Sequence, residues 1–498
     1  MIPTLNPQAP ANIPTYSLTD WQGGTRSLPD EYDYWIDEVT GEIPAGLVGT
    51  LFRNGPGLLD IGGVALKHPF DGDGMICAFT FKDGRVHFRN RYVQTTGYQA
   101  EQRAGKILYR GVFGTPKPGG WLNNFFDMKL KNIANTQVIY WGAKLLALWE
   151  AAWPYQLNPA TLETLGEINL DGLLKPGDAF AAHPRLDPQQ QRLVNFSLKP
   201  GLTTAARLFE FALDGTCVSQ QDYSFPGFAF IHDFALTPNY GIFFQNPVQL
   251  NPIPYLLGFK GAAECLSFNP QNPTHIWLLP RSGGTPLHFT MPACFVFHHA
   301  NAFELGDDIV VDSICYESFP GLDSDTDYRQ VDFASLPPGQ LWRIRINKTS
   351  QAVTMNQLDP RCCEFPCLHP NYVGQPYRYL YTAAADNPTG NAPLQGILRL
   401  DLETQTQEFW SAALRGFVTE PVFVPDPTRI NPEDSASQET AGWLLVLTYE
   451  ASRQKSDLVI LDAANVRQGP LARLHLKHHI PYGLHGTFTP QTFMDASV

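Results

Sequence analysis

Short strands that return on themselves through tight turns are the feature that most restricts the fold of this chain. The segment 79–93, FTFKDGRVHFRNRYV, places an Asp-Gly pair between two alternating arms, which is a strong signal for a β-hairpin. The segment 209–223, FEFALDGTCVSQQDY, repeats the form, and similar stretches continue to the C-terminus. Pro and Gly, with 42 and 41 residues, punctuate the whole chain rather than marking one linker. The pattern predicts an all-β fold.

Two architectures accommodate many short strands at roughly even spacing. Radial repetition of four-stranded sheets gives a β-propeller, and 498 residues suffice for one as a single unit. A pair of β-sandwich domains fits the strand pattern nearly as well. Helical periodicity is scarce, so we expect only a helical excursion over 119–135 and an apolar loop over 251–264.

Composition excludes several classes of function. The formal net charge is −13, so no basic field exists to meet the phosphates of a nucleic acid. No apolar stretch reaches the ~18–20 residues of a membrane-spanning helix. Residues 1–14 lack the basic start and apolar core of a secretory signal. The eight cysteines form no even framework, as in a reducing compartment. We expect a cytoplasmic protein, with no obligate protein partner evident.

Four of the thirteen histidines occupy apolar or glycine-flanked stretches, where little water is expected: His183, His232, His298 and His485. A single histidine of this kind is more often a hydrogen-bonded core residue than a metal ligand. Four of them in one chain shift the balance toward a metal site. His298 has a neighbour, His299, and because a strand alternates its faces the two cannot both point inward.

Three glutamates lie in similarly apolar stretches: Glu150, Glu364 and Glu420. An ionised glutamate rarely stays buried without a partner. A metal-bound imidazole supplies one, since its second nitrogen donates a hydrogen bond that fixes the ring. Together with the four histidines these residues recur at intervals of 33 to 66 along the chain. Such spacing fits the axis of a seven-bladed propeller, with coincidence from selective choice as the alternative.

These histidine and glutamate contexts, in this order, resemble the carotenoid cleavage oxygenase family. The resemblance runs almost end to end, from GTLFRNGPG (49–57) and HPFDGDGM (68–75) through WE, CCEFP and TEP to LHGTF (484–488). It is closest to the branch that cleaves apocarotenoids. It implies a seven-bladed β-propeller over 1–498 as a single domain, with a loop and helix cap on the face that carries the active site.

The resemblance also implies ferrous iron, with dioxygen as co-substrate, held by His183, His232, His298 and His485. His298 matches the family pattern His-x-x-Asn-Ala, which leaves His299 packed or hydrogen-bonded on the other face. Glu150, Glu364 and Glu420 are expected to support His232, His298 and His485 respectively, while His183 has no glutamate in the pattern. Thr136 matches a residue beside the open coordination position.

The implied activity is oxidative cleavage of one carbon–carbon double bond of an apocarotenoid, at the central 15,15′ bond in this branch, giving retinal-type aldehydes. Trp149, Phe297, Phe365 and Phe113 are expected to line a substrate tunnel, with ordinary propeller core as the alternative. The rival functions are cleavage of a stilbene or of another apocarotenoid bond, zinc-dependent hydrolysis, and a non-catalytic propeller that binds a partner protein.

An insoluble polyene must be taken from a membrane, and two apolar segments are suited to contact one. They are the stretches 111–135 and 251–264, which in the family form a patch around the tunnel mouth. Lys117, Lys129 and Lys131 are expected to meet anionic headgroups. The prediction is peripheral membrane association, and the alternative is a pair of loops folded onto the propeller face.

Overall fold

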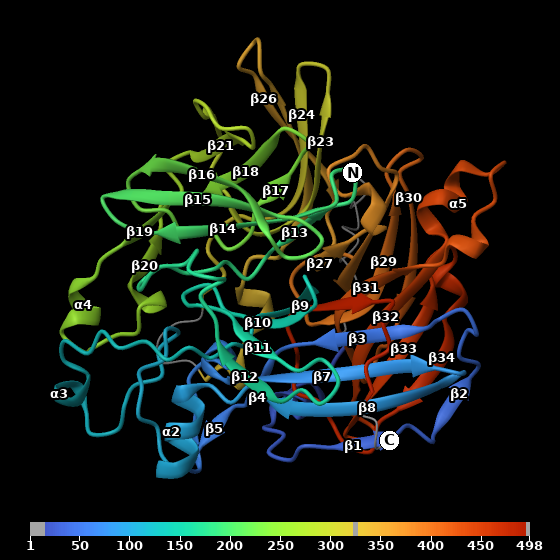
Figure 1. Cartoon of the computed structure of the whole chain (residues 1–498), viewed down its shortest axis with the longest axis horizontal. Helices are drawn as coiled ribbons and strands as arrows, with labels where there is room; N and C mark the ends of the chain where they lie inside the picture. The colour runs from blue at the N-terminus through green and yellow to red at the C-terminus, as the bar shows by residue number, and fades with distance from the viewer. Residues whose placement is uncertain (1–14, 322–326, 495–498) are drawn as a thin grey trace, which may run out of the picture.

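Seven antiparallel β-sheets surround a common axis and form the body of the molecule (Figure 1). The structure is a computed structural model that describes residues 15–321 and 327–494. The stretch 1–14, analysed above for a secretory signal, lies outside the described residues. Among the described residues no helix is long and apolar enough to cross a membrane.

Five of the sheets each contain four strands from one continuous part of the chain. In chain order they are β9 (Gln137–Trp141), β10 (Lys144–Leu148), β11 (Tyr155–Leu157) and β12 (Thr164–Glu167); β13 (Arg185–Asp187), β14 (Arg192–Lys199), β15 (Thr203–Phe211) and β16 (Cys217–Pro226); β17 (Ala235–Leu236), β18 (Tyr240–Gln245), β21 (Thr274–Pro280) and β22 (Leu287–Met291); β23 (Phe295–Leu305), β24 (Asp308–Tyr316), β25 (Gln340–Asn347) and β26 (Val353–Asp359); and β27 (Cys363–Cys367), β28 (Tyr379–Ala385), β29 (Leu394–Asp401) and β30 (Thr406–Ser411).

The other two sheets each combine strands from both ends of the chain, and so close the ring. One contains β1 (Asp33–Trp35), β8 (Arg85–Tyr92), β7 (Asp73–Lys82), β3 (Gly49–Arg53) and β35 (Gly486–Thr489), with β4 (Pro56–Leu58) paired to β7; the other contains β2 (Val39–Gly41), β34 (Pro470–His475), β33 (Lys455–Asp462), β32 (Gly442–Glu450) and β31 (Gly416–Pro425). Backbone pairing of β35 with β3 and of β2 with β34 therefore closes the ring twice. The predicted seven-bladed propeller is confirmed, and the alternative of two sandwich domains is excluded.

The hairpins follow the turn chemistry read from the sequence. Asp83 and Gly84 both have positive φ, 53° and 70°, as a two-residue turn that matches strand twist requires. Strands deep in the ring are buried on both faces because neighbouring sheets cover them. The strand β32, for example, is buried along nearly its whole length, which explains why its sequence GWLLVLTYE is apolar with little alternation.

The seven innermost strands are β9, β13, β17, β23, β27, β31 and β35. Contacts between sheets link β13 to β17, β17 to β23, β23 to β27, β27 to β31, β31 to β35 and β35 to β9. These strands line the axis, so side chains at their ends can meet although they come from distant parts of the sequence.

Short elements between the sheets form a cap, and Figure 1 shows α2, α3 and α4 on one side of the molecule. The remaining elements are α1 (Leu18–Gln22), α2 (Thr96–Ala104), α3 (Trp121–Asn124), α4 (Ile253–Leu256) and α5 (Ser435–Thr440), with the two-stranded pairs β5 (Asp60–Ile61) with β6 (Val64–Ala65) and β19 (Val248–Leu250) with β20 (Leu266–Phe268). The helix expected over 119–135 is wrong except for the four residues of α3. Asn124 ends it, because its amide donates to the carbonyls of Lys117 and Gly120.

Candidate metal centre and adjoining cavity

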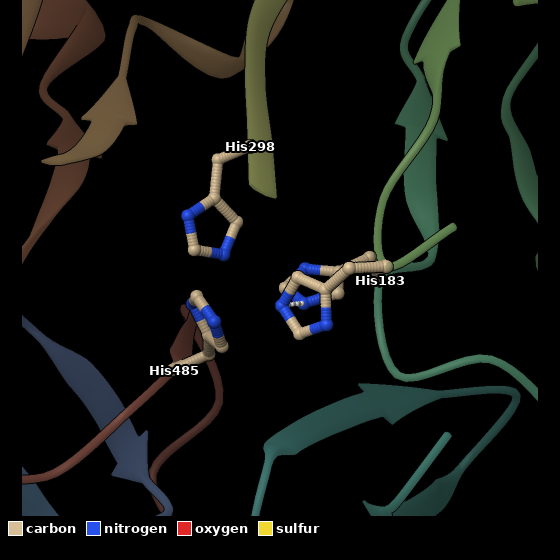
Figure 2. Close-up of side chains that lie close together, drawn as sticks. His183, His298 and His485 are labelled. Carbon is tan, nitrogen blue, oxygen red and sulfur yellow. Dashed lines mark hydrogen bonds between the residues drawn. The ribbon is translucent and has the colours of Figure 1, made fainter. Parts of the chain in front are cut away.

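Four histidines from four different sheets meet at the axis. His183 lies just before β13, His232 just before β17, His298 within β23 and His485 just before β35. One ring nitrogen from each lies within 4.8 Å of the other three. Figure 2 shows the rings of His183, His298 and His485 pointing toward one another. Donors that converge this closely from four strands are suited to bind a single metal ion.

Irregularities in the inner strands turn these side chains toward the axis. The pairing of β23 with β24 shifts register on both sides of His299, and the pairing of β27 with β28 shifts after Glu364. The pairing of β31 with β32 likewise shifts around Glu420, between Val418 and Pro421. Such bulges re-aim side chains and are frequent beside functional sites.

Three of the imidazoles hydrogen-bond to half-buried glutamates. The Nδ1 atom of His232 lies 2.7 Å from Glu150 Oε1. In the same way His298 Nδ1 lies 2.5 Å from Glu364 Oε2, and His485 Nδ1 lies 2.8 Å from Glu420 Oε1. Because Nδ1 donates to the carboxylate, Nε2 of each ring is left as the acceptor that faces the centre.

The ring nitrogens that face the centre are placed to bind a metal ion rather than to hydrogen-bond with other protein groups. His298 Nε2 is buried and has no hydrogen-bond partner in the described part of the chain. His183 Nε2 and His232 Nε2 lie 2.8 Å apart, so these two ring nitrogens point at one position. No carboxylate contacts His183 among the described residues, in keeping with the pattern expected from the sequence.

Electrostatics at the site keep the carboxylates ionised, and their effect on the imidazoles differs from ring to ring. Burial lowers the pKa of His485, whereas at His298 the effect of burial is outweighed by Glu364, which raises the pKa. Burial alone raises the pKa of Glu364, but the adjoining His298 and its hydrogen bonds lower that pKa below its usual value. The same balance, with His485 and Arg53 as partners, lowers the pKa of Glu420. Burial holds the pKa of His183 well below its usual value. A divalent cation suits this environment, because its ligands must be deprotonated.

Two residues that support the glutamates were missed in the sequence. Arg53, only 3% exposed, places Nη1 2.5 Å from Glu420 Oε2 and donates from Nη2 to the carbonyl of Leu484 at 3.0 Å. Tyr316 donates its hydroxyl to Glu364 Oε1 at 2.8 Å. Arg53 lies inside the apolar stretch GTLFRNG. That position could have indicated that its charge is buried.

Glu150 reaches the axis although it does not sit on an innermost strand. It follows β10, the second strand of its sheet, whereas Thr136 directly precedes the innermost strand β9. Because the two strands run antiparallel, with Leu148 opposite Gln137, the end of β10 and the start of β9 reach the axis together. The Thr136 hydroxyl lies 3.2 Å from Glu150 Oε2.

His299 points away from the axis. Its side chain is buried, its Nδ1 lies 2.8 Å from the Ser313 hydroxyl, and its ring meets Phe244 edge-on. Burial lowers the pKa of His299 to about 4. Of the two adjacent histidines, only His298 therefore joins the cluster.

The buried neutral state of His299 predicts acid sensitivity. Its pKa is about 4 in the folded protein, against an ordinary value near 6.5. Between pH 6.5 and 4, His299 is therefore protonated in the unfolded chain but neutral in the folded protein. The free energy of unfolding falls as the pH falls through this range. We expect this residue to contribute a loss of about 1.4 kcal/mol per pH unit in that window. Denaturant unfolding of the metal-free protein between pH 7 and 5 measures it. The variant His299→Gln should show a correspondingly shallower slope, and parallel slopes would contradict the assignment.

An apolar cavity of about 450 Å³, here called the metal cavity, adjoins the cluster. Trp149, Phe297, Phe365 and Phe113, the four aromatic residues named from the sequence, are all in its wall. His232, His298 and His485 line it too, and no lysine or arginine does so in the described part of the chain. A cavity of this size and character is suited to a hydrocarbon-like molecule. The molecule is thus a seven-bladed propeller with an axial four-histidine site, suited to a metal ion, beside an apolar cavity.

Comparison with known proteins identifies the family. The family model described as retinal pigment epithelial membrane protein matches residues 25–490. The chain belongs to this family, the carotenoid cleavage oxygenases, as the resemblance read from the sequence predicted.

Individual relatives cover nearly the whole chain. Apocarotenoid-15,15'-oxygenase of Synechocystis is 52% identical over 95% of this chain and 97% of its own length. Lignostilbene-alpha,beta-dioxygenase isozyme III of Sphingomonas paucimobilis is 31% identical over 94% of this chain and 96% of its own length. The crystal structure of the cobalt-substituted Synechocystis apocarotenoid oxygenase superposes with a TM-score of 0.93 and 51% identity, covering 96% of this chain and 100% of that one.

Proposed function

We propose that this protein uses ferrous iron to cleave one carbon–carbon double bond of an apocarotenoid with dioxygen, at the central 15,15′ bond, giving retinal-type aldehydes. The observation that carries the proposal is the convergence of four imidazoles beside an apolar cavity. The 52% identity to an apocarotenoid-15,15'-oxygenase supports the choice of substrate and of bond.

In this proposal His183, His232, His298 and His485 hold the iron, which when bound supplies the redox centre for dioxygen. Glu150, Glu364 and Glu420 fix the three imidazoles that they contact and raise their basicity. Thr136 lies beside the open coordination position, where it lines the metal cavity. The donor set suits iron(II), since imidazole is among the ligands that iron accepts readily.

The protein's contribution to the chemistry is placement and exclusion of water. Trp149, Phe297, Phe365 and Phe113 confine an extended polyene so that one double bond lies beside the cluster. The reaction balances without an added reductant: the carbon–carbon double bond supplies four electrons, dioxygen accepts them, and each carbon receives one oxygen atom.

The experiment that tests the proposal uses the iron-loaded protein and a series of apocarotenals of different length in ¹⁸O-labelled dioxygen. The expected products are two aldehydes cut at the central bond, identified by mass. If no member of the series is cleaved, the proposal is wrong. Products cut elsewhere would keep the reaction class and change the bond.

Cleavage of a stilbene is less well supported. A phenol or phenolate needs a polar or cationic partner, and the described wall of the metal cavity contains no lysine or arginine. Of its two tyrosines, Tyr316 already donates to Glu364, and Tyr255 has its ring covered by the Arg110 guanidinium. The zinc hydrolase alternative is disfavoured because the three glutamates near the cluster already accept hydrogen bonds from imidazoles. A non-catalytic interaction protein would contain no bound metal, so elemental analysis of the purified protein separates that reading from ours.

For localisation we propose a cytoplasmic protein that associates peripherally with a membrane through the segments 111–135 and 251–264. Both segments carry exposed apolar side chains: Trp121, Leu122, Phe125, Phe126, Met128, Leu130, Ile253 and Phe259. The backbone N–H of Phe126 donates to the carbonyl of Leu256 at 2.8 Å, which joins the two segments. Met128 and Leu130 also line the metal cavity, so the apolar surface continues into it. The eight unpaired cysteines agree with a reducing compartment.

The expected contribution of lysines to this contact needs correction. Lys131 is buried and pairs with Asp73 at 2.6 Å and Glu101 at 2.5 Å, so it is wrongly placed to meet headgroups. Lys117 pairs with Asp127 at 2.6 Å. Lys129 is exposed and lies over the ring of Tyr109.

Charging the exposed apolar surface should release the protein from membranes. Leu122 and Phe126 are 68% and 61% exposed, so the double change Leu122→Glu with Phe126→Glu leaves the core intact. Because burial of one large apolar side chain contributes about 1.5–3 kcal/mol, we expect liposome binding to fall at least about 10-fold. Sedimentation with liposomes measures the change. Leu202→Glu, at a residue 98% exposed outside both segments, is the matched control. If the unmodified protein does not sediment, membrane contact is wrong.

A further inference from the structure

His183 differs from the other three axial histidines, because among the described residues no carboxylate contacts it. Each of the other three donates from Nδ1 to a glutamate, which fixes the direction of the ring. His183 is nevertheless placed as closely as they are: its Nε2 lies 2.8 Å from His232 Nε2, and its ring centre lies 4.5 Å from that of His485. Other contacts must therefore fix the position of His183.

The main chain that follows His183 is stiff. Pro184 comes directly after it, and the proline ring holds its own φ at about −65°. The residue before a proline is in turn confined to extended conformations. Arg185, the first residue of β13, comes next. The place of the His183 main chain therefore depends on where Arg185 is anchored.

Arg185 is anchored outside its own sheet. Its Nη2 donates to the carboxylate of Asp233 and, at 2.8 Å, to the carbonyl of His299. Its Nε donates to the carbonyl of Phe234 at 3.1 Å. One guanidinium thus joins β13 to the residues just before β17 and to β23.

The carboxylate of Asp233 completes the network. Asp233 is 2% exposed, its Oδ2 accepts from the backbone N–H of His299 at 2.9 Å, and its Oδ1 accepts from the N–H of Phe234 at 2.7 Å. Asp233 directly follows His232, and His299 directly follows His298. Hydrogen bonds to an ionised carboxylate are stronger than those between neutral groups. The network therefore holds the chain next to three of the four axial histidines.

We propose that the ion pair of Arg185 and Asp233 positions His183, in the role that the glutamates have for the other three histidines, and so keeps the site in shape before the metal binds. Neither residue lines the metal cavity, so both act through the main chain of the segments that carry the histidines. A site that is already ordered binds more tightly, because less ordering remains to be done on binding. The inference rests on the proposed function, since it assumes a divalent metal at the four histidines.

The alternative is that this ion pair only stabilises the propeller, and a second pair in the chain serves as a matched control. Arg343 donates to Asp312 at 2.8 Å and 2.7 Å. The two side chains are 23% and 0% exposed, against 21% and 0% for Arg185 and Asp233. They lie on β25 and β24, and neither side chain hydrogen-bonds to a residue that adjoins an axial histidine in the described part of the chain.

The test removes both charges of a pair together, so that no buried charge is left without a partner. In the double variant Arg185→Met with Asp233→Asn we expect the affinity for cobalt(II) to fall about 10-fold, as measured by competition with a chelator. The control, Arg343→Met with Asp312→Asn, should keep its cobalt affinity although the thermal unfolding of its metal-free form changes to a similar extent.

Arg185→Lys is the conservative variant. It keeps a charge beside Asp233, but one ammonium group cannot reach all the acceptors of the guanidinium, so its cobalt affinity should lie between those of the unmodified protein and the double variant. If the double variant does not fold, Arg185→Lys compared with Arg343→Lys decides the question in the same way.

Unchanged cobalt affinity in the Arg185 variants overturns the inference, as does an equal loss in the Arg343 controls. Both of these results leave the proposed function standing. If the unmodified protein itself binds no cobalt, the proposed function fails together with the inference.

Discussion

Replacement of His298 by alanine is expected to remove both bound iron and cleavage activity. His298 lies on β23 with its Nε2 buried and unpaired, aimed at the other three imidazoles. Its loss leaves three ligands, and it also leaves Glu364 as a buried carboxylate without its main partner. We expect metal content below a tenth of that of the unmodified protein, and no detectable product, because the change removes a ligand where loss of a supporting carboxylate alone costs about 10–100-fold in metal affinity. Elemental analysis and product assays measure the two effects.

The neighbouring residue provides the matched control. His299→Gln alters a neighbouring, more deeply buried histidine that hydrogen-bonds to Ser313 and faces away from the cluster. This variant should keep its metal and its activity while it changes stability. Circular dichroism verifies that both variants fold. A result in which His299→Gln loses the metal and His298→Ala retains it would reverse the assignment of the two residues.

The residues by themselves predicted an all-β fold and singled out the four histidines and three glutamates, whereas the choice of a propeller over two sandwich domains and the ligand roles followed from the resemblance to the family. Strand hairpins have local signals such as Asp83-Gly84, where the turn type demands particular residues. The histidines gave a second kind of signal, because each lies in an apolar stretch of sequence. A polar group is rarely buried in such a stretch unless it has a partner there. Both signals are present within a few residues along the chain.

Contacts between residues far apart in the sequence were not predicted. Arg53 meets Glu420 across a separation of 367 residues, and nothing near either residue indicates the pairing. Glu150 was expected to face the axis, but nothing in the sequence indicated that it does so from the end of β10, beside the start of β9. The helix expected over 119–135 failed for a different reason: its apolar residues lie exposed at the cap, so they never belonged to a helical face packed on a core.

Replacement of Glu364 by glutamine is expected to weaken metal binding while keeping the fold. The amide oxygen of glutamine can still accept from His298 Nδ1, and its N–H can donate to the Tyr316 hydroxyl, which turns to accept, so the geometry of the site is retained. What is lost is the negative charge that raises the basicity of the imidazole. We expect the affinity for iron(II) or cobalt(II) to fall about 10–100-fold, or about 1.4–2.8 kcal/mol. Competition with a chelator measures the affinity, and cobalt is a suitable probe because a similar protein was crystallised with it.

The equivalent change at Glu420 separates the role of charge from the role of structure. Glu420 accepts from Arg53 as well as from His485, so Glu420→Gln leaves a buried guanidinium without its counterion. This variant should lose metal affinity like Glu364→Gln, and in addition its metal-free form should be less stable by about 3–5 kcal/mol. Thermal unfolding of the metal-free proteins makes the comparison. Unchanged metal affinity in both variants would show that the carboxylates do not act on the imidazoles, and equal stability of the two would show that Arg53 does not depend on Glu420.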